Sequence, residues 1–206
     1  MQEIDFIFGI AILIMSVVVH EVSHGQMAYI LGDPTAKRAG RLTLNPINHL
    51  DLFGSILLPL LLLLSKSGFL VGWAKPVPYN PYNLKNQKWG PALVALAGPA
   101  ANIIIALIFG IVLKIARFMP ESLLAPFLQI SLSVVFINLL LAVFNLMPIP
   151  PLDGSKILFA FLPYKWFRLQ AFLEQWGVFI LIFFIIFVFG QIFPVIQFLF
   201  RLITGF

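Results

Sequence analysis

His20, Glu21 and His24 form the pattern His-Glu-x-x-His, which is the strongest chemical signal in the sequence. On a helix, the two histidines are one turn apart and lie about 40° from each other around the axis, so both imidazoles can bind one metal ion. Glu21 falls beside that face and can accept a proton from a water molecule that the metal activates. The spacing predicts a zinc site that hydrolyses a bond.

The same motif lies deep inside an apolar stretch, residues 6–31. A charged residue near the centre of a bilayer costs about 2.5–3.5 kcal/mol even on the most lenient scale. Three titratable groups at that depth therefore need a strong reason, and a bound metal supplies one. The alternative is a polar helix end near the interface, where water or neighbouring helices satisfy the side chains.

Two histidines do not complete a catalytic zinc site, because such sites take three protein ligands and leave one position open. Asp153 is the best candidate for the third ligand, since it follows the helix-breaking run Pro148-Ile149-Pro150-Pro151-Leu152 and precedes a glycine. The alternative role for Asp153 is the N-cap of a helix that starts at Gly154. The sequence around Asp153 leaves both roles open.

The composition requires a membrane around these residues. The chain has 206 residues, of which 61% are hydrophobic and only 10% charged, with no cysteine, and its mean hydropathy is +1.02. Soluble domains carry about a quarter charged residues, so lipid must cover much of this surface. We expect one domain over residues 1–206, an all-α polytopic membrane protein. The net charge of +5 is explained by basic loops between apolar runs, so no nucleic-acid partner is expected.

Five apolar stretches organise the chain, and four of them reach the length of about 20 residues that a spanning helix needs. The stretches are residues 6–31, 52–64, 91–113, 126–147 and 177–200. The second is short and contains Pro59, which is typical of a re-entrant segment. The sequence therefore predicts about four spanning helices and one re-entrant apolar segment.

The basic residues assign a side of the membrane to each loop. Lysines and arginines gather in residues 32–51, 72–90 and 153–176, whereas the N-terminus carries only Glu3 and Asp5. The positive-inside rule then places all three basic segments in the cytoplasm and the N-terminus outside, provided that the second stretch returns to its starting side. In that topology the first and fourth stretches run in the same direction. Asp153 then reaches the depth of His24, and the site faces the cytoplasm.

With these motifs in place, the chain resembles the site-2 protease family of intramembrane zinc metalloproteases over nearly its whole length. The motifs that carry the resemblance are HEVSH at 20–24, GDPTAKRAGRLTLNP at 32–46, GWAKPVP at 72–78, GPAAN at 98–102 and NLMPIPPLDG at 145–154. The chain is similar to the minimal branch, which lacks appended PDZ or CBS domains. Ser155 departs from the family, which often has a second glycine there.

The resemblance implies one Zn²⁺ per chain, held by His20, His24 and Asp153, with Glu21 as general base. It also implies that Asn145 stabilises the carbonyl of the substrate. The expected function is hydrolysis of peptide bonds of transmembrane proteins within or near the bilayer, as in regulated intramembrane proteolysis. The expected location is a prokaryotic cell membrane, and the expected partners are transmembrane substrates and the lipid bilayer. The sequence indicates no oligomeric state.

Three further residues are candidates for substrate binding. Asn102 is an amide on a helix of small apolar residues, where its alternative role is to hydrogen-bond between helices. Trp73 and Pro76 lie in residues 71–82, an alternating, proline-rich segment that predicts an extended edge able to pair with an unwound substrate. The family resemblance implies a short membrane-associated β-hairpin in this segment, and the alternative is an interfacial loop anchored by aromatic residues. His49 lies in a polar cluster, and we expect it to order a loop.

Two functions of other classes compete with proteolysis. A divalent-metal carrier or sensor also places His, Glu and Asp inside the membrane, but it would use Glu21 as a ligand, whereas a protease needs that carboxylate free. Paired half-repeats with broken helices, which are common in transporters, are not evident in the sequence. A catalytically silent scaffold is disfavoured because the sequence supplies the whole ligand set.

Overall fold

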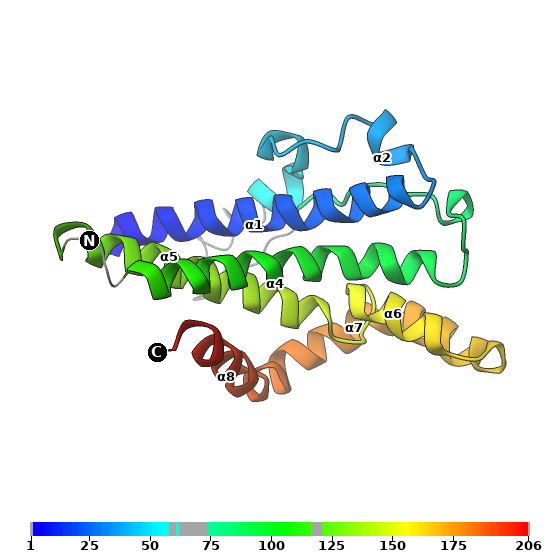
Figure 1. Ribbon diagram of the computed structural model, residues 1–206. Helices are drawn as coiled ribbons and strands as arrows, with labels where there is room; N and C mark the ends of the chain where they lie inside the picture. Colours follow the sequence, from blue (N-terminus) through cyan, green and yellow to red (C-terminus); the bar gives the residue numbers. More distant parts are fainter. Residues whose placement is uncertain (1, 58–60, 62–73, 117–120, 206) are drawn as a thin grey trace.

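Long apolar helices make up most of the computed structural model, which describes residues 2–57, 61, 74–116 and 121–205 (Figure 1). The long helices are α1 (Gln2–Ile30), α4 (Gly90–Ala116), α5 (Glu121–Asn145) and α7 (Phe167–Phe187). Four segments are long and apolar enough to cross a membrane, namely Ile7–Ile30, Gly90–Ala116, Pro126–Asn145 and Tyr164–Phe187. The described residues contain no β-strand. The predicted all-α, multi-pass membrane fold is confirmed.

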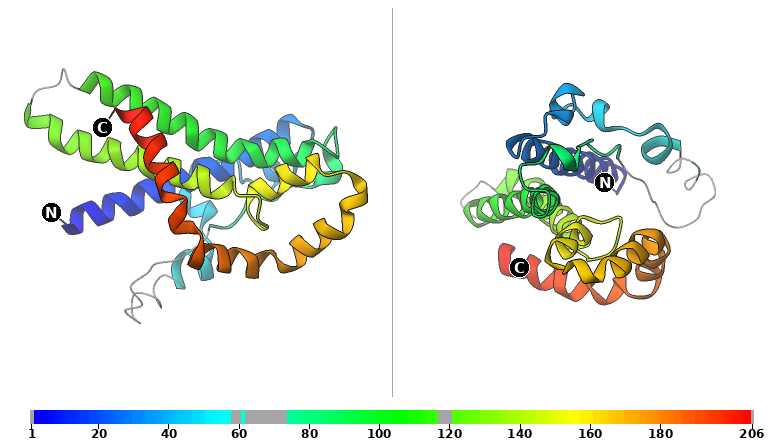
Figure 2. Two further views of the ribbon diagram at one scale, coloured as in Figure 1. Left: turned by 90° about the horizontal axis from the view of Figure 1, so that it is seen from below. Right: turned by 90° about the vertical axis from the view of Figure 1, so that its right-hand side faces the viewer.

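Helix α4 is the centre of the bundle and packs against both α1 and α5. It runs opposite to these two helices, so α1 and α5 point the same way, as the predicted topology requires (Figures 1 and 2). The chain leaves α1 and enters α4 at the same end of the bundle, which is also where α5 ends (Figure 1). The ends that carry His24 and Asp153 therefore meet.

Shorter elements connect the long helices. They are α2 (Thr35–Arg38), the 3-10 turns η1 (Pro46–His49), η3 (Pro81–Asn83) and η4 (Tyr164–Trp166), the π-helical turn η2 (Leu52–Leu57) and α6 (Asp153–Phe161). Helix α6 packs on α4. The 3-10 turn η5 (Phe189–Gln191) and α8 (Phe193–Thr204) complete the chain.

Apolar residues are distributed as a membrane protein requires. A buried cluster joins α4, α5 and α8, built on Ala106, Leu113, Val135, Leu139 and Ile196. Other large side chains of α4, among them Ile104, Leu107, Ile108 and Ile111, are exposed. Such a surface is stable only against lipid, because water would have to hydrate every one of these side chains.

The predicted last span, residues 177–200, has the wrong bounds. The last spanning segment begins earlier, at Tyr164, and ends at Phe187, after which α8 starts as a separate helix with Pro194 in its first turn. Proline has no amide hydrogen and its ring collides with the carbonyl of the preceding turn, so α7 cannot continue through this position. The apolar run continues through the break, which is why hydropathy alone merged two helices.

Part of the predicted re-entrant segment and hairpin lies outside the described residues. Of the second apolar stretch, residues 52–57 form η2, while 58–60 and 62–64 are outside, as are residues 71–73 of the predicted extended edge. Residues 74–80 are irregular, and Pro81–Asn83 make a 3-10 turn where an extended strand is predicted. The side chain of Asn80 accepts a hydrogen bond from the amide of Tyr82 and starts this turn.

Candidate metal centre

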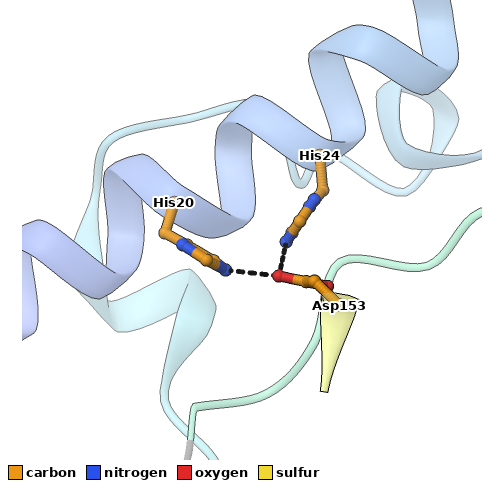
Figure 3. Close-up of side chains that lie close together, drawn as sticks. All are labelled: His20, His24 and Asp153. Atoms are coloured by element: carbon orange, nitrogen blue, oxygen red, sulfur yellow. Dashed lines mark hydrogen bonds and ion pairs between the residues drawn. The ribbon is translucent and has the colours of Figure 1, made fainter. Parts of the chain in front are cut away.

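Three predicted ligands converge in the structure. His20 and His24 extend from one face of α1, and the Asp153 carboxylate approaches them from the start of α6 (Figure 3). The Nε2 atoms of both histidines lie 3.1 Å from Oδ2 of Asp153. One ligand atom from each residue lies within 4.8 Å of the other two. Residues from the first and last thirds of the chain thus meet at one point.

Asp153 directs its carboxylate at the two histidines and does not cap its helix. The N-cap of α6 is Leu152, and no side chain makes a capping hydrogen bond there. Gly154 allows the tight turn, because a Cβ at this position would overlap the carbonyl oxygen of Leu146. Ser155, which replaces the second glycine of the family, is fully buried and donates its hydroxyl to the Leu152 carbonyl at 2.7 Å. The serine therefore fits the turn.

The hydrogen bonds of the Nδ1 atoms show which nitrogen of each histidine is free to bind a metal. Nδ1 of His24 lies 2.7 Å from the backbone carbonyl of Val94, and Nδ1 of His20 lies 2.5 Å from Oδ1 of Asn102. Carbonyl oxygens only accept hydrogen bonds, so both Nδ1 atoms carry the proton. In the neutral rings Nε2 is then the atom with the free lone pair.

Two such nitrogens facing one carboxylate oxygen fit a cation. Lone pairs on nitrogen and oxygen repel each other at 3.1 Å unless a positive charge lies between them. Extra protons on both imidazoles would place two charges in the apolar interior, which is expensive. A two-nitrogen, one-oxygen set is typical of catalytic zinc and leaves a fourth position open. The donor set therefore fits Zn²⁺.

Gly98 of α4 leaves the space that the two imidazoles occupy. A Cβ at this position would lie 2.5 Å from Nε2 of His24 and 2.6 Å from Nε2 of His20. Real Cβ atoms essentially never approach other heavy atoms below 3.0 Å. The absence of a side chain at Gly98 is therefore required for both imidazoles to point at Asp153.

Glu21 lies beside the metal-binding group but is not part of it. Within the described chain, that group consists of His20, His24 and Asp153. The Oε2 atom of Glu21 accepts a hydrogen bond of 2.8 Å from the backbone amide of Val77. The carboxylate thus faces a peptide N–H, which is the type of group that a proteolytic base must protonate.

Residues 74–80 are fixed over this part of α1. The amide of Lys75 donates to the carbonyl of His49 at 2.9 Å. The guanidinium of Arg41, which is buried, donates to the carbonyls of Lys75 at 2.7 Å and Pro76 at 3.4 Å. His49 also contacts the Thr43 carbonyl through Nε2 at 2.8 Å, so it orders the loop as expected.

Asp33 fixes the far end of the same segment. Its carboxylate is fully buried and accepts hydrogen bonds from Thr35, from the amide of Asn80 at 2.6 Å and from Nδ2 of Asn83 at 2.8 Å. Burial raises the pKa of Asp33, but these hydrogen bonds outweigh burial, so the pKa is below its ordinary value. The ionised form of Asp33 therefore stabilises this loop.

The remaining predicted residues lie in different positions. Asn145 is the last residue of α5 and donates Nδ2 to the carbonyl of Leu141 at 2.9 Å. Pro76 is exposed, and Trp73 lies outside the described residues. Asn102 is fully buried and contacts His20, so it faces the metal centre from behind and is not open to a substrate.

Two residues behind the site were missed by the sequence reasoning. Asn138 of α5 is fully buried and Ser16 of α1 is nearly so, and both are hydrogen-bonded in the same cluster as Asn102. The available signal was an asparagine in the middle of an apolar span, since such a side chain needs a partner.

The sequence is similar to known proteins over most of its length. The profile of peptidase family M50 matches residues 8–128 and 114–188. A protein of Bacillus subtilis (YwhC) is 43% identical over 150 residues, which cover 71% of this chain and 65% of that protein. A protein of Mycolicibacterium smegmatis (Rip2) is 33% identical over 178 residues, 86% of this chain and 66% of that one.

Both relatives bear the name putative zinc metalloprotease. The matched region spans slightly less than two thirds of their lengths, 65% and 66%. No solved structure shows a significant match to the chain.

Proposed function

The chain belongs to peptidase family M50, and from that premise we propose that it is a zinc-dependent endopeptidase that hydrolyses transmembrane proteins within or near the bilayer. The observation that carries the proposal is the convergence of His20, His24 and Asp153 inside a bundle of membrane-length helices. The assignment of these residues as ligands, one ion per chain, is part of the proposal. Substrates, partners and the single-domain organisation over residues 1–206 are proposed on the same basis.

In the proposed reaction, Glu21 is the general base. Zinc, when bound, polarises a carbonyl and makes water more acidic. Glu21 accepts the proton of the attacking water and then delivers it to the leaving amine nitrogen, so the carboxylate is regenerated in each cycle. The hydrogen bond between Glu21 and the amide of Val77 supports this role, because a substrate amide in the same place would receive that proton.

Asn145 and the 74–80 segment are proposed to hold the substrate. The amide of Asn145 can donate to the substrate carbonyl after releasing Leu141, which its present hydrogen bond occupies. Trp73, Pro76 and the predicted hairpin would guide an unwound strand toward Glu21. The support for this role is the position of Val77 directly against Glu21 and Gly25.

We propose that the active site opens toward the cytoplasm. The end of the bundle that carries the site also carries α2, with Lys37 and Arg38, and α6, with Lys156 (Figure 1). Positive loops remain on the cytoplasmic side. The predicted re-entrant path of the second apolar stretch belongs to this topology, as does a prokaryotic membrane.

Glu21 also separates the protease from a metal carrier. A carrier would add this carboxylate to the metal-binding group, whereas here its Oε2 accepts from Val77. The decisive experiment is Glu21→Gln in the full chain, reconstituted in liposomes with a model transmembrane substrate. We expect bound zinc to remain and cleavage to fall by about 10²–10⁴-fold, the usual contribution of a general base.

A matched control is Glu174→Gln, which makes the same change on the exposed face of α7. This variant should cleave at the wild-type rate. Equal cleavage by Glu21→Gln and wild type would refute the proposed mechanism. Loss of zinc from Glu21→Gln, at unchanged fold, would favour the carrier.

A further inference from the structure

A chain of buried polar side chains runs through the middle of the helix bundle behind the metal centre. Asn102 of α4 and Asn138 of α5 are fully buried, and Ser16 of α1 is 5% exposed. Amides in an apolar interior are costly unless every polar atom has a partner. Here hydrogen bonds connect the three side chains to one another and to His20.

A backbone carbonyl in α5 fixes the orientation of the Asn138 amide, and with it the donors and acceptors along this series of hydrogen bonds. One side-chain atom of Asn138 lies 2.9 Å from the carbonyl oxygen of Val134. A carbonyl can only accept, so this atom is the amide nitrogen, which also lies 2.9 Å from Oγ of Ser16. The oxygen of Asn138 must therefore point the other way, toward Asn102.

The orientation of the Asn102 amide is fixed in the same way, and it determines which atom faces His20. Its nitrogen donates to Oδ1 of Asn138 at 2.7 Å and to the backbone carbonyl of Ser16 at 3.3 Å. Turning the amide over would place oxygen against two acceptors. The oxygen of Asn102 is consequently held at Nδ1 of His20, 2.5 Å away, where only an N–H can satisfy it.

We propose that Asn138 is a positioning residue of the metal centre, which acts through Asn102 to fix the tautomer of His20. With the proton held on Nδ1, the lone pair of Nε2 is offered to the ion. The inference rests on the proposed function for the identity of His20 as a zinc ligand. The new element is the role of Asn138 on α5. Among the described residues it reaches the proposed ligands only through Asn102, yet it controls which nitrogen of His20 carries the proton.

The two histidines differ in this respect. Nδ1 of His24 donates to a backbone carbonyl, that of Val94, which no side-chain substitution removes. Nδ1 of His20 depends on side chains alone. Substitutions at Asn102 and Asn138 should therefore change His20 and leave His24 as it is.

The test separates hydrogen-bond polarity from packing. Asn138→Leu and Asn102→Leu keep side-chain volume but remove the amides, and zinc affinity should fall by about 10–100-fold, as for other partners of ligating histidines. Asn138→Asp and Asn102→Asp keep the oxygen that accepts on the side toward His20 but place a second oxygen where the amide nitrogen donates to backbone carbonyls, so zinc affinity should recover only in part relative to the leucine variants. Affinity is measured on the purified full-length protein by competition with a zinc-binding dye.

The tautomer itself is read by nitrogen NMR of the metal-free protein with ¹⁵N-labelled imidazoles. The sequence contains only three histidines, so the signals of His20, His24 and His49 can be assigned by single substitutions. Spectra are recorded at a pH above which the imidazole signals no longer change, so that the tautomers of the neutral rings are observed. We expect His20 in wild type to carry its proton on Nδ1, and Asn138→Leu to give a mixture of tautomers.

Leu139→Ala is the control for packing, because Leu139 is buried next to Asn138 in α5 but belongs to the apolar cluster. It should weaken the fold without changing the tautomer of His20. A wild-type His20 with its proton on Nε2 would overturn the proposal without any variant. Wild-type zinc affinity in Asn138→Leu would also overturn it. If the variants differ in zinc affinity as expected but the wild-type protein cleaves no substrate, the inference about Asn138 is supported and the proposed protease activity is refuted.

Discussion

Gly98→Ala should empty the metal centre, although alanine normally stabilises a helix relative to glycine by about 0.5–1 kcal/mol. The new methyl group would lie 2.5 Å and 2.6 Å from the two Nε2 atoms, against an ordinary lower limit of 3.4 Å for such contacts. Relief requires a displacement of about 0.8–0.9 Å at the imidazoles or a shift of α4. Metal–ligand distances tolerate only about ±0.2 Å.

The expected loss of zinc affinity is therefore more than the roughly 10–100-fold that follows from disturbing one partner of a ligand. If α4 shifts instead of the imidazoles, the strain of an overfilled core costs about 1–3 kcal/mol of folding stability. Zinc stoichiometry of the detergent-purified protein at a buffered free zinc concentration measures the first effect. Thermal unfolding of the same samples measures the second.

Two matched glycines on spanning helices serve as controls. Gly110 lies on the same helix, and a Cβ there would overlap Ile203 of α8. Gly110→Ala should lower stability and keep zinc. Gly9 of α1 faces open space, with no neighbouring atom within 4 Å of the position that a Cβ would take, so Gly9→Ala should keep both. Gly98→Ala with one tightly bound zinc per chain would refute the argument that this glycine makes room for the ligands.

Three other variants test the site and its supports. Asp153→Ala should lose bound zinc while the protein stays monodisperse, as checked by metal analysis and gel filtration, and full zinc occupancy would contradict its ligand role. Arg41→Ala removes the hydrogen bond to the Lys75 carbonyl and should lower folding stability by about 1.5–3 kcal/mol. Limited proteolysis should then cut residues 74–80 faster than in wild type. An unchanged rate of cutting would contradict this expectation. Asp33→Asn places an amide group against the N–H of Asn80 and should cost about 1–3 kcal/mol at neutral pH. Folding lowers the pKa of Asp33, so the carboxylate contributes fully to folding stability above a pH of about 4, and this contribution is lost as the pH falls toward the folded-state pKa. The difference in Tm between wild type and Asp33→Asn should therefore narrow in acid. A difference in Tm that does not change with pH would contradict this role of Asp33.

The helix positions were predictable because hydropathy and helix-ending residues agree for most of the chain. Residues 91–113 and 126–147 correspond to α4 (Gly90–Ala116) and α5 (Glu121–Asn145), with boundaries only a few residues apart. The last span was misplaced because Phe and Ile continue through the break between α7 and α8, at residues 188–192. Hydropathy measures transfer to lipid and carries little information about where one helix stops and another begins.

The convergence of His20, His24 and Asp153 was predictable for a different reason. His20 and His24 are related by helix geometry alone, and Asp153 follows from the direction of the helices together with the chemistry of zinc. The partners of the ligands were not predictable in the same way. Asn138 meets Asn102 across two helices, and Val77 meets Glu21 through a backbone amide, whose place no side-chain pattern encodes.

The position of Asp153 gives the ion a mechanical role in addition to its chemical one. His20 and Asp153 are separated by 133 positions in the chain, so a shared ion is a cross-link that closes a very long loop between the first helix and α6. Ligands that bind only the folded state stabilise it by mass action, about 2.7 kcal/mol at a free concentration of 100 times Kd. Chelation should therefore lower the Tm of the wild type and leave that of Asp153→Ala unchanged. Metal supply would then govern how much intact protein the membrane holds as well as how fast it works.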